Sequence, residues 1–447
     1  MNKNIVIEEK IKQRKEITER VKKTLIERLR LPLAPDEISD DVPLFGIGLG
    51  LDSVDALEIV VGIEQEFGIT ITDEDMQAFR SINTIVDFII EGKKEYEISK
   101  IEIPKTLFPY PTFEEEYWAI RENIGLIDMS SITKLKIVGK DVQIWLDKLI
   151  TGNLLSLYEG KSIYTCFCDE NGYIIALVQI LQDKEGYIVF SDAEKRETLL
   201  SWLNKHLEEG IYIEDMSDKF ACFSVIGYNA VEIPKDLISE DILGLPYLGF
   251  LYDKIDNIEV LLYRFGLTGE LEYRFIVPNE FAKIIWQKIV ESGKKYNLRI
   301  CSSDILPTLM LEMKSVNQLR DIRPTTTTLQ AGLHWMIQYN KEKFIGKEAL
   351  LLEKNRGTDS KLLSCIFHDE CQVKENASVF LLDKKVGEMV NTSYSLTLGK
   401  RIGLMYIDTK YAWVGLELEV EAFDGKKRVT TVSAPLFITK SVKGIRG

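Results

Sequence analysis

The sequence has few of the residues that build metal sites, and it lacks long apolar runs. Its 447 residues include three histidines and six cysteines, and the cysteines lack the paired spacing of a zinc-binding motif. We therefore expect reduced, mostly buried thiols and no structural metal. No apolar run reaches about 18 residues, the length of a membrane span, and the first residues lack the apolar core of a secretory signal. These absences predict a cytoplasmic chain without a membrane partner.

Basic residues are scarce over residues 31–92, which hold 14 acids and the single base Arg80. Residues 1–30 differ, because they hold ten bases and five acids. The whole chain has a net charge of −14, and this acidity argues against a nucleic-acid partner. It favours protein partners that present a basic docking face to the acidic segment.

A glycine-rich loop that ends at Asp52 leads into an acidic helix. Asp52 is a residue type that caps helices, and apolar residues recur at spacings of three and four from Val54 to Phe67. Ser53 lies in the first turn, with no histidine nearby in the sequence that could activate it as a nucleophile. No strand precedes the glycines within a βαβ pattern, so we reject a dinucleotide-binding loop.

This combination resembles an acyl carrier protein over about residues 15–92. The resemblance implies that Ser53 carries a 4′-phosphopantetheine arm and that Asp52, Asp55 and Glu58 are recognised by partner enzymes. Those partners would be a phosphopantetheinyl transferase, enzymes that load an acyl or aminoacyl group, and downstream enzymes of natural-product or fatty-acid biosynthesis. The alternative is an acidic helical bundle with an accidental Asp-Ser pair, in which the serine only caps the helix.

The length of the chain indicates several domains. We predict a four-helix carrier over residues 1–92 with a long basic first helix, a linker over 93–112, an α+β part over 113–360 and a β-barrel over 361–447. The linker contains three prolines and no periodicity. Such a tether keeps the carrier at an effective concentration on the order of millimolar near the rest of the chain.

After the linker the hydrophobic pattern changes from helical to mixed. Helices are predicted at 113–123, 141–150, 194–208 and 279–292, and strands at 135–139, 164–167, 173–181, 187–190, 259–263 and 273–277. From about residue 362 the pattern is one of short strands and turns, which suggests a barrel or sandwich.

This order resembles the aminomethyltransferase family, the T protein of glycine cleavage and its folate-using relatives, over residues 113–447. The matching segments are Glu122–Met129, Gly266–Glu270, Thr328–Trp335, Phe344–Leu350 and Gly387–Lys400. The resemblance implies a multidomain fold: an α-helical carrier bundle, then an α+β T-protein-like cloverleaf with a C-terminal β-barrel. In the family a central channel of the cloverleaf holds a reduced folate.

The residues that do the family's chemistry are changed in this sequence. The working aspartate of the family lies in a Gly-Gly-x-x-Asp-Asp strand, but Ala176 and Leu177 occupy the two acidic positions. Neither side chain can orient a folate or take up a proton. Met310 stands where relatives have an arginine. Ordinary aminomethyl transfer to folate is therefore not expected, and we assign no catalytic residue.

Four residues remain as candidates for folate binding. Glu270 matches the carboxylate that would pair with the donor edge of a pterin, and Trp335, Ser191 and Tyr164 would complete the site. For Glu270 the alternative is an ion pair with Arg264 or Arg274, and for Trp335 and Tyr164 it is a place in the core. Of the three histidines, only His334 lies within a family motif.

These observations leave two classes of function open. In the first, the chain is a carrier-linked enzyme whose T-protein-like part modifies a thioester on Ser53, with tetrahydrofolate as a candidate cofactor. In the second, that part is a non-catalytic scaffold that docks the carrier to other enzymes; a folate-independent reaction is a third possibility. Whether the chain is an enzyme is thus undecided. The basic segment 283–299 is a candidate docking face for Asp52, Asp55 and Glu58.

Overall fold

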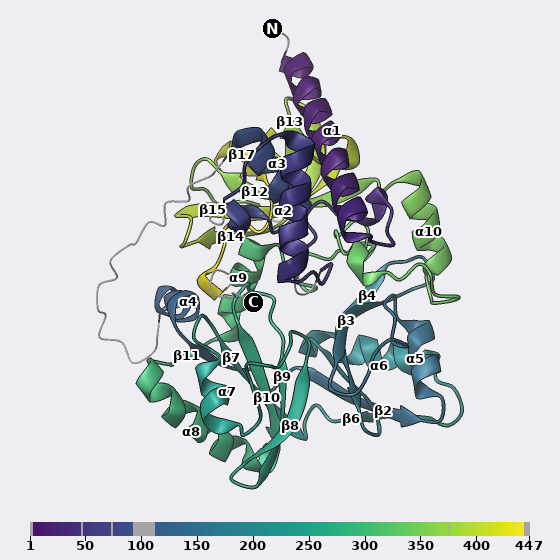
Figure 1. Cartoon of the computed structure of the whole chain (residues 1–447), viewed down its shortest axis with the longest axis vertical. Helices are drawn as coiled ribbons and strands as arrows, with labels where there is room; N and C mark the ends of the chain where they lie inside the picture. Colours follow the sequence, from purple (N-terminus) through teal and green to yellow (C-terminus); the bar gives the residue numbers. More distant parts are fainter. Residues whose placement is uncertain (1–2, 46–47, 73–74, 93–111, 375, 442–447) are drawn as a thin grey trace.

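The computed structural model describes residues 3–45, 48–72, 75–92, 112–374 and 376–441. The predicted linker therefore lies almost entirely outside the described residues. Within them the chain forms a helical carrier, an α+β part with two sheets, and a closed barrel (Figure 1). The predicted fold class is confirmed.

The described part of the carrier has three α-helices and two short 3-10 helices. These are α1 (Lys3–Leu29), η1 (Pro35–Glu37), α2 (Ser53–Phe67), η2 (Asp75–Ala78) and α3 (Ile82–Glu91). Leu25, Ile63 and Val86, one from each α-helix, are fully buried in a common core. The helical spacing after Asp52 predicted the helix but not its buried face: Val54, Leu57 and Val61 are exposed, whereas Ile59 and Ile63 are buried. Two single turns of 3-10 helix accompany the three full helices.

The first sheet of the α+β part is antiparallel, with the order β3-β4-β5-β2-β6. Its strands are β2 (Thr133–Gly139), β3 (Ser162–Cys168), β4 (Ile174–Asp183), β5 (Gly186–Ser191) and β6 (Ile211–Asp215). The helices α5 (Val142–Leu149) and α6 (Arg196–Lys205) contribute Leu146 and Leu199 to the core on one face of this sheet.

The second sheet has the order β11-β1-β7-β10-β9-β8 and pairs β1 with β11 in parallel. Its strands are β1 (Gly125–Asp128), β7 (Phe220–Ile226), β8 (Phe250–Ile255), β9 (Ile258–Arg264), β10 (Glu272–Pro278) and β11 (Arg299–Cys301). The helices α4 (Phe113–Glu122), α7 (Glu232–Leu237) and α8 (Ala282–Gly293) pack beside it. The two sheets meet through their inner faces, where Phe190 stacks on Tyr263 with 5.2 Å between ring centroids.

The C-terminal part closes a barrel in the order β12-β15-β14-β13-β16-β17. Its strands are β12 (Ser360–Phe367), β13 (Ser378–Leu381), β14 (Lys384–Ser395), β15 (Lys400–Asp408), β16 (Glu417–Ala422) and β17 (Gly425–Val432). The helices α9 (Leu306–Met313) and α10 (Lys347–Arg356) precede it. Closure leaves this sheet without open edge strands.

Two further observations concern sequence predictions. All six cysteines are buried, in agreement with the expected core thiols. Every helix among the described residues is too short or too polar to cross a membrane.

Candidate functional site

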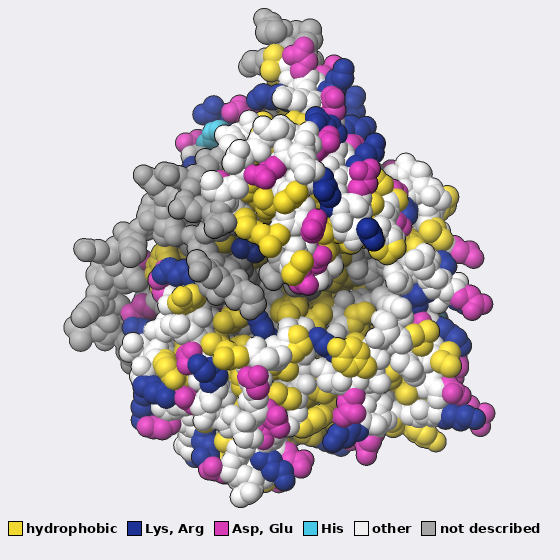
Figure 2. Space-filling view, viewed as in Figure 1, with side chains coloured by type: hydrophobic (Ala, Val, Ile, Leu, Met, Phe, Trp, Pro, Cys, Tyr) yellow, Lys and Arg dark blue, Asp and Glu magenta, His cyan; other side chains and the backbone are white. Residues whose placement is uncertain are grey.

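The carrier presents the beginning of α2 toward the middle of the molecule. Arg20 bonds Glu66 at 2.8 Å, while Arg28, further along α1, lies against Gly62. The two helices are therefore antiparallel, and α2 begins at Ser53 at its lower end (Figure 1). Figure 2 shows a hollow below the carrier with a largely hydrophobic floor.

The first turn of α2 is open to the surface. The Asp52 carboxylate accepts hydrogen bonds from the backbone N–H groups of Val54 and Asp55 at 2.7 and 3.0 Å, and so caps the helix. Val54 and Leu57 are more than half exposed, at 66% and 57%. Asp52 and Glu58 are exposed and Asp55 is half-buried; their recognition by partners remains a prediction.

Among the described residues, the polar contacts that join the carrier to the T-protein-like part come from the residues around η1 and from the start of α3. Asp41 forms an ion pair with Lys314, and both side chains are more than nine-tenths buried. Glu37 pairs with Lys354 at 2.7 Å. Ser81 donates a hydrogen bond to the carbonyl of residue 434 at 2.7 Å. Asp52 and Glu58, at the start of α2, stay exposed while the carrier is docked.

The carrier does not dock on the basic segment 283–299, which the sequence suggested as its docking face. That segment lies largely on α8, on the far side of the body from the carrier (Figure 1). Its charges pair within their own domain: Lys295 with Asp236 at 2.9 Å, and Lys288 with Asp256. Local neutralisation leaves these cations little attraction for a distant acidic helix.

A cluster of aromatic side chains lies directly under the docked carrier. Trp335 packs against the carrier core, and its ring centroid is 6.2 Å from that of Tyr164. Tyr164 meets Phe265 edge-on at 5.3 Å, and Phe265 stacks on Tyr247 at 6.2 Å. We call Tyr164, Tyr247, Phe265 and Trp335 the aromatic cluster. Trp335 thus belongs both to the carrier interface and to the cluster.

His334 belongs to the same interface. Its Nδ1 is buried without a hydrogen-bond partner among the described residues. Burial and the nearby cations Lys361 and Lys22 lower the pKa of His334 to about 3, against the effect of Asp40. A histidine that stays neutral at the carrier contact is suited to packing and not to proton transfer at neutral pH.

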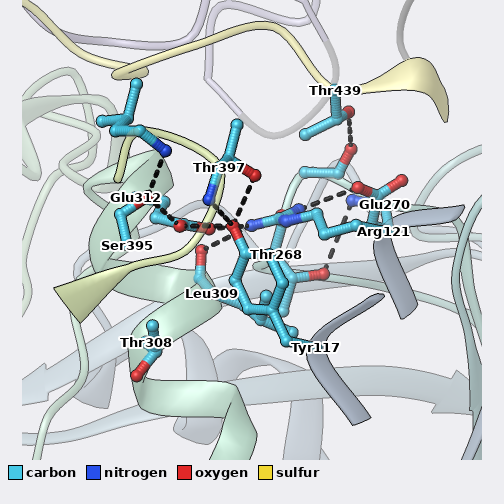
Figure 3. A network of polar contacts seen from close by, with 12 residues as sticks. Tyr117, Arg121, Thr268, Glu270, Thr308, Leu309, Glu312, Ser395, Thr397 and Thr439 are labelled. Carbon is cyan, nitrogen blue, oxygen red and sulfur yellow. Dashed lines mark hydrogen bonds and ion pairs between the residues drawn. The ribbon is translucent and has the colours of Figure 1, made fainter. Parts of the chain in front are cut away.

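Glu270 lies in a buried polar network centred on Arg121 (Figure 3). The Arg121 guanidinium donates to Glu270 Oε1 at 2.8 Å and to Glu312 Oε2 at 2.6 Å. The side chains of both acids have no exposed surface, and that of Arg121 is 4% exposed. Burial opposes the charge of Arg121, but the two carboxylates raise its pKa above the ordinary value. The three charges therefore hold one another in place.

The remaining acceptors of this network are also occupied. Glu312 Oε1 accepts hydrogen bonds from Tyr117 at 2.6 Å and from Ser395 at 2.5 Å. Arg121 also donates to the carbonyl of Thr268 at 2.7 Å. Helix α4, helix α9 and the barrel strand β14 are thereby joined through one set of contacts (Figure 3). Such a network ties domains together.

The residues 433–441, which we call the C-terminal strap, complete the network. Ser433 donates to Asp87 of the carrier at 2.5 Å. The strap then crosses to the α+β part, where Thr439 donates to the carbonyl of Gly269 at 2.5 Å and Ser441 donates to Glu270 Oε2. One segment of nine residues thus contacts both the docked carrier and Glu270.

These contacts correct the alternative that the sequence suggested for Glu270. The carboxylate is paired, but with Arg121 and not with Arg264 or Arg274. Arg274 pairs with Glu272 at 2.5 Å, and Arg264 donates to a backbone carbonyl. Both oxygens of Glu270 are occupied by protein groups, so it offers no free edge to a pterin. The site as arranged does not fit a folate bound through this residue.

The strand that holds the family's aspartates is apolar here. Ala176 and Leu177 are buried, and Leu177 packs in a hydrophobic cluster. The Gln318 amide oxygen accepts a hydrogen bond from the Leu177 N–H at 2.9 Å. Ser191, a predicted folate contact, donates to the Leu177 carbonyl at 3.2 Å. Protein groups therefore fill the place of the lost carboxylates.

Sequence reasoning missed a carboxylate next to this position, that of Asp192. Strands β4 and β5 pair Gln179 with Phe190, and two further steps in the same register place Asp192 across from Leu177. Gln318 Nε2 donates to Asp192 Oδ2 at 2.7 Å. Burial raises the pKa of Asp192, although the bond from Gln318 lowers it. The pairing of the predicted strands 173–181 and 187–190 was the signal that could have revealed this residue.

Comparisons with known proteins agree with the domain order. The family model "Phosphopantetheine attachment site" matches residues 19–89, "GCVT N-terminal domain" matches residues 92–341, and "Glycine cleavage T-protein C-terminal barrel domain" matches residues 361–438.

Individual relatives point the same way. A protein named aminomethyltransferase from Caldanaerobacter subterraneus is 33% identical over 310 residues, which are 68% of this chain and 82% of that protein. Another of the same name, from Thermoanaerobacter sp., is 31% identical over 340 residues, 74% of this chain and 92% of that protein. The crystal structure of glycine cleavage system aminomethyltransferase T from Bartonella henselae has a TM-score of 0.67 at 17% identity and covers 73% of this chain and 90% of that chain. The last match shows a shared fold.

Proposed function

Because the chain belongs to the glycine cleavage T-protein family and carries a phosphopantetheine-type carrier domain, we propose that its T-protein-like part acts on a group carried at Ser53. The arm of 4′-phosphopantetheine supplies a thiol that holds an acyl or aminoacyl group as a thioester, and a phosphopantetheinyl transferase is the partner that attaches it. The observation that carries the proposal is the docked carrier, whose core shares Trp335 with the aromatic cluster. The start of α2 faces the hollow beside this contact (Figures 1 and 2).

The residues of the T-protein-like part favour a reaction that does not use folate at Glu270. The Arg121 network occupies both Glu270 oxygens, and the family's aspartate positions are apolar. Tyr164, a member of the aromatic cluster, and Asp192, whose charge acts on Tyr164, provide polar groups in this region. Burial and the charge of Asp192 raise the pKa of Tyr164, so its hydroxyl stays protonated and can donate a hydrogen bond to the cargo.

A second candidate function is supported by the same network. If Arg121, Glu270 and Glu312 act only to hold domains together, the T-protein-like part is a scaffold that presents the carrier to other enzymes. The exposure of Asp52 and Glu58 in the docked state favours this reading as well, since other enzymes could engage them. In this case the cargo would pass through the chain unchanged.

Loading the full chain with acetyl or glycyl pantetheine separates the two candidates. A phosphopantetheinyl transferase and the matching coenzyme A thioesters would load Ser53, and mass spectrometry would follow the loaded group over time. If the T-protein-like part is an enzyme, the full chain changes or releases the group faster than the variant Asp41→Ala, which lacks the ion pair with Lys314 that holds the carrier in place. An unchanged group in both proteins supports the scaffold.

The variant Ser53→Ala tests the attachment site itself. We expect no loading of this variant, while Ser156→Ala, which removes an exposed serine of a distant loop, loads normally. Circular dichroism checks that both variants are folded. Loading and processing that persist without Ser53 would contradict the proposal.

A further inference from the structure

Asp192 is an acidic residue whose charge is poorly compensated. Among the residues that the structure describes, its carboxylate accepts one hydrogen bond, from Gln318, and no lysine or arginine nitrogen lies within ion-pair distance of it. The side chain is only partly buried, so a ligand could reach it. A carboxylate that is partly removed from water and has no cation beside it is less stable in its charged form.

Arg274, the arginine near Asp192, does not compensate the charge of this carboxylate. Arg274 is close enough to Asp192 to affect its pKa, but its guanidinium is committed to Glu272 at 2.5 Å and to the Tyr263 hydroxyl at 3.0 Å. The side chains of Arg274 and Glu272 are 12% and 3% exposed. The two form a closed pair, so Arg274 makes no direct ion pair with Asp192 among the described residues.

Aromatic rings lie on the same face of the first sheet as this carboxylate. The register pairs Tyr164 with Gln179 and Gln179 with Phe190, and Asp192 follows two residues after Phe190, so these side chains project from one face. The charge of Asp192 raises the pKa of Tyr164. The Tyr164 ring also lies near the Trp335 ring, which packs against the carrier core. A carboxylate beside aromatic faces is a setting that binds alkylammonium groups, because the anion pairs with the charge and the rings attract it through their π-systems.

We infer that Asp192 binds the protonated amino group of an aminoacyl cargo delivered by the carrier. This inference rests on the proposed function, since it takes the loaded group to enter the region of the aromatic cluster. It narrows the cargo from acyl or aminoacyl groups to amine-bearing ones. Gln318 is the positioning residue, because it holds Asp192 Oδ2 while its other end is fixed by the Leu177 N–H.

The test compares two stable probes on the full chain: glycyl-pantetheine and acetyl-pantetheine in which an amide replaces the thioester. Titration calorimetry at pH 7 should give about tenfold tighter binding of the glycyl probe, the size expected for one charge-assisted contact. In Asp192→Asn this preference should disappear. The matched variant Asp183→Asn, at the far end of β4, should keep it.

A pH series on the unmodified chain provides a measurement that needs no variant. The preference for the glycyl probe should fall as the pH falls through the raised pKa of Asp192, because the protonated acid no longer attracts an ammonium. Equal binding of both probes at pH 7, or a preference that survives in Asp192→Asn, overturns the inference and leaves the proposed function standing. Failure of both probes to bind overturns the inference together with the proposed function.

Discussion

Glu270 and Asp192 are two acids of the T-protein-like part with opposite surroundings. Glu270 has no exposed side-chain surface, a partner on each oxygen and an arginine at 2.8 Å. Asp192 is partly exposed and accepts a single hydrogen bond from an amide. Glu270, which matches the family motif, thus forms contacts that hold the domains together, whereas Asp192, which lies outside the motif, keeps part of its surface exposed. Matching a motif identifies a residue, but its partners decide what that residue can do.

Removing Arg121, the cation that Glu270 and Glu312 share, tests the difference between Glu270 and Asp192 most directly. In Arg121→Met, two buried carboxylates lose their partner, and we expect a loss of about 3–5 kcal/mol in the free energy of unfolding. Asp192→Asn should change it by less than about 1 kcal/mol, because the amide replaces a weakly compensated charge. Urea denaturation measures both. Equal losses of unfolding free energy in Arg121→Met and Asp192→Asn would contradict the structural role assigned to Glu270 and the binding role proposed for Asp192.

The next effect concerns the carrier interface. Lys314→Met leaves Asp41 buried without its cation, which we expect to weaken docking by about 3 kcal/mol. Hydrogen exchange should then become faster in α3 and around Trp335, while α4, held by the Arg121 network, stays protected. Lys283→Met, at an exposed lysine of α8, is the control and should change neither. Faster exchange in α4 would show that the two regions are not independent.

A smaller effect is expected from pH. The pKa of His334 is lowered to about 3 in the docked state, while a free histidine has a pKa near 6.5. Below about pH 6.5 the undocked form binds a proton that the docked form excludes, so docking weakens as the pH falls. Between pH 7 and pH 5 this amounts to about 1–2 kcal/mol.

Hydrogen exchange of α3 at pH 7 and pH 5, corrected for the intrinsic rates, would measure the pH effect. In His334→Gln the dependence should shrink, since glutamine does not titrate. Docking that strengthens toward pH 5 would show that another group controls the interface.

The smallest expected effect is on tetrahydrofolate. Because Arg121 and Ser441 occupy Glu270, we expect dissociation constants in the millimolar range for the full chain. Ser441→Ala frees one oxygen and should tighten binding by only a few-fold, since the Arg121 contact remains. Calorimetry measures both proteins. Micromolar binding of tetrahydrofolate to the unchanged chain would mean that the contacts of Glu270 with Arg121 and Ser441 do not keep it from binding the cofactor.

The sequence was sufficient for features set by local pattern or by family motif. The helical spacing after Asp52, the alternation over 164–167 and 173–181 and the short strands after about residue 362 predicted α2, the strands β3 and β4, and the barrel. The spacing did not predict which face of α2 is buried. Strands β6 to β8 were not predicted. The losses at Ala176 and Leu177 were visible because the strand pattern around them was intact.

The partners of the site residues were not predictable, because they come from distant parts of the chain. Arg121 is 149 positions from Glu270 in the sequence, and Ser441 is 171 positions away. No local pattern links such positions, so the nearby Arg264 and Arg274 seemed the natural partners. Trp335 was expected either to bind folate or to lie in the core, and its contact with the carrier depended on a docking mode that charge alone did not predict.

The C-terminal strap also sets an order of events during synthesis. The carrier leaves the ribosome first, but Ser433, which bonds Asp87, follows 346 residues later. At 5–20 residues per second, this separation corresponds to roughly 17–70 s. A newly made carrier can therefore fold long before the strap that fastens it exists. Throughout this interval a phosphopantetheinyl transferase would meet a carrier that is not yet fastened to the rest of its own chain.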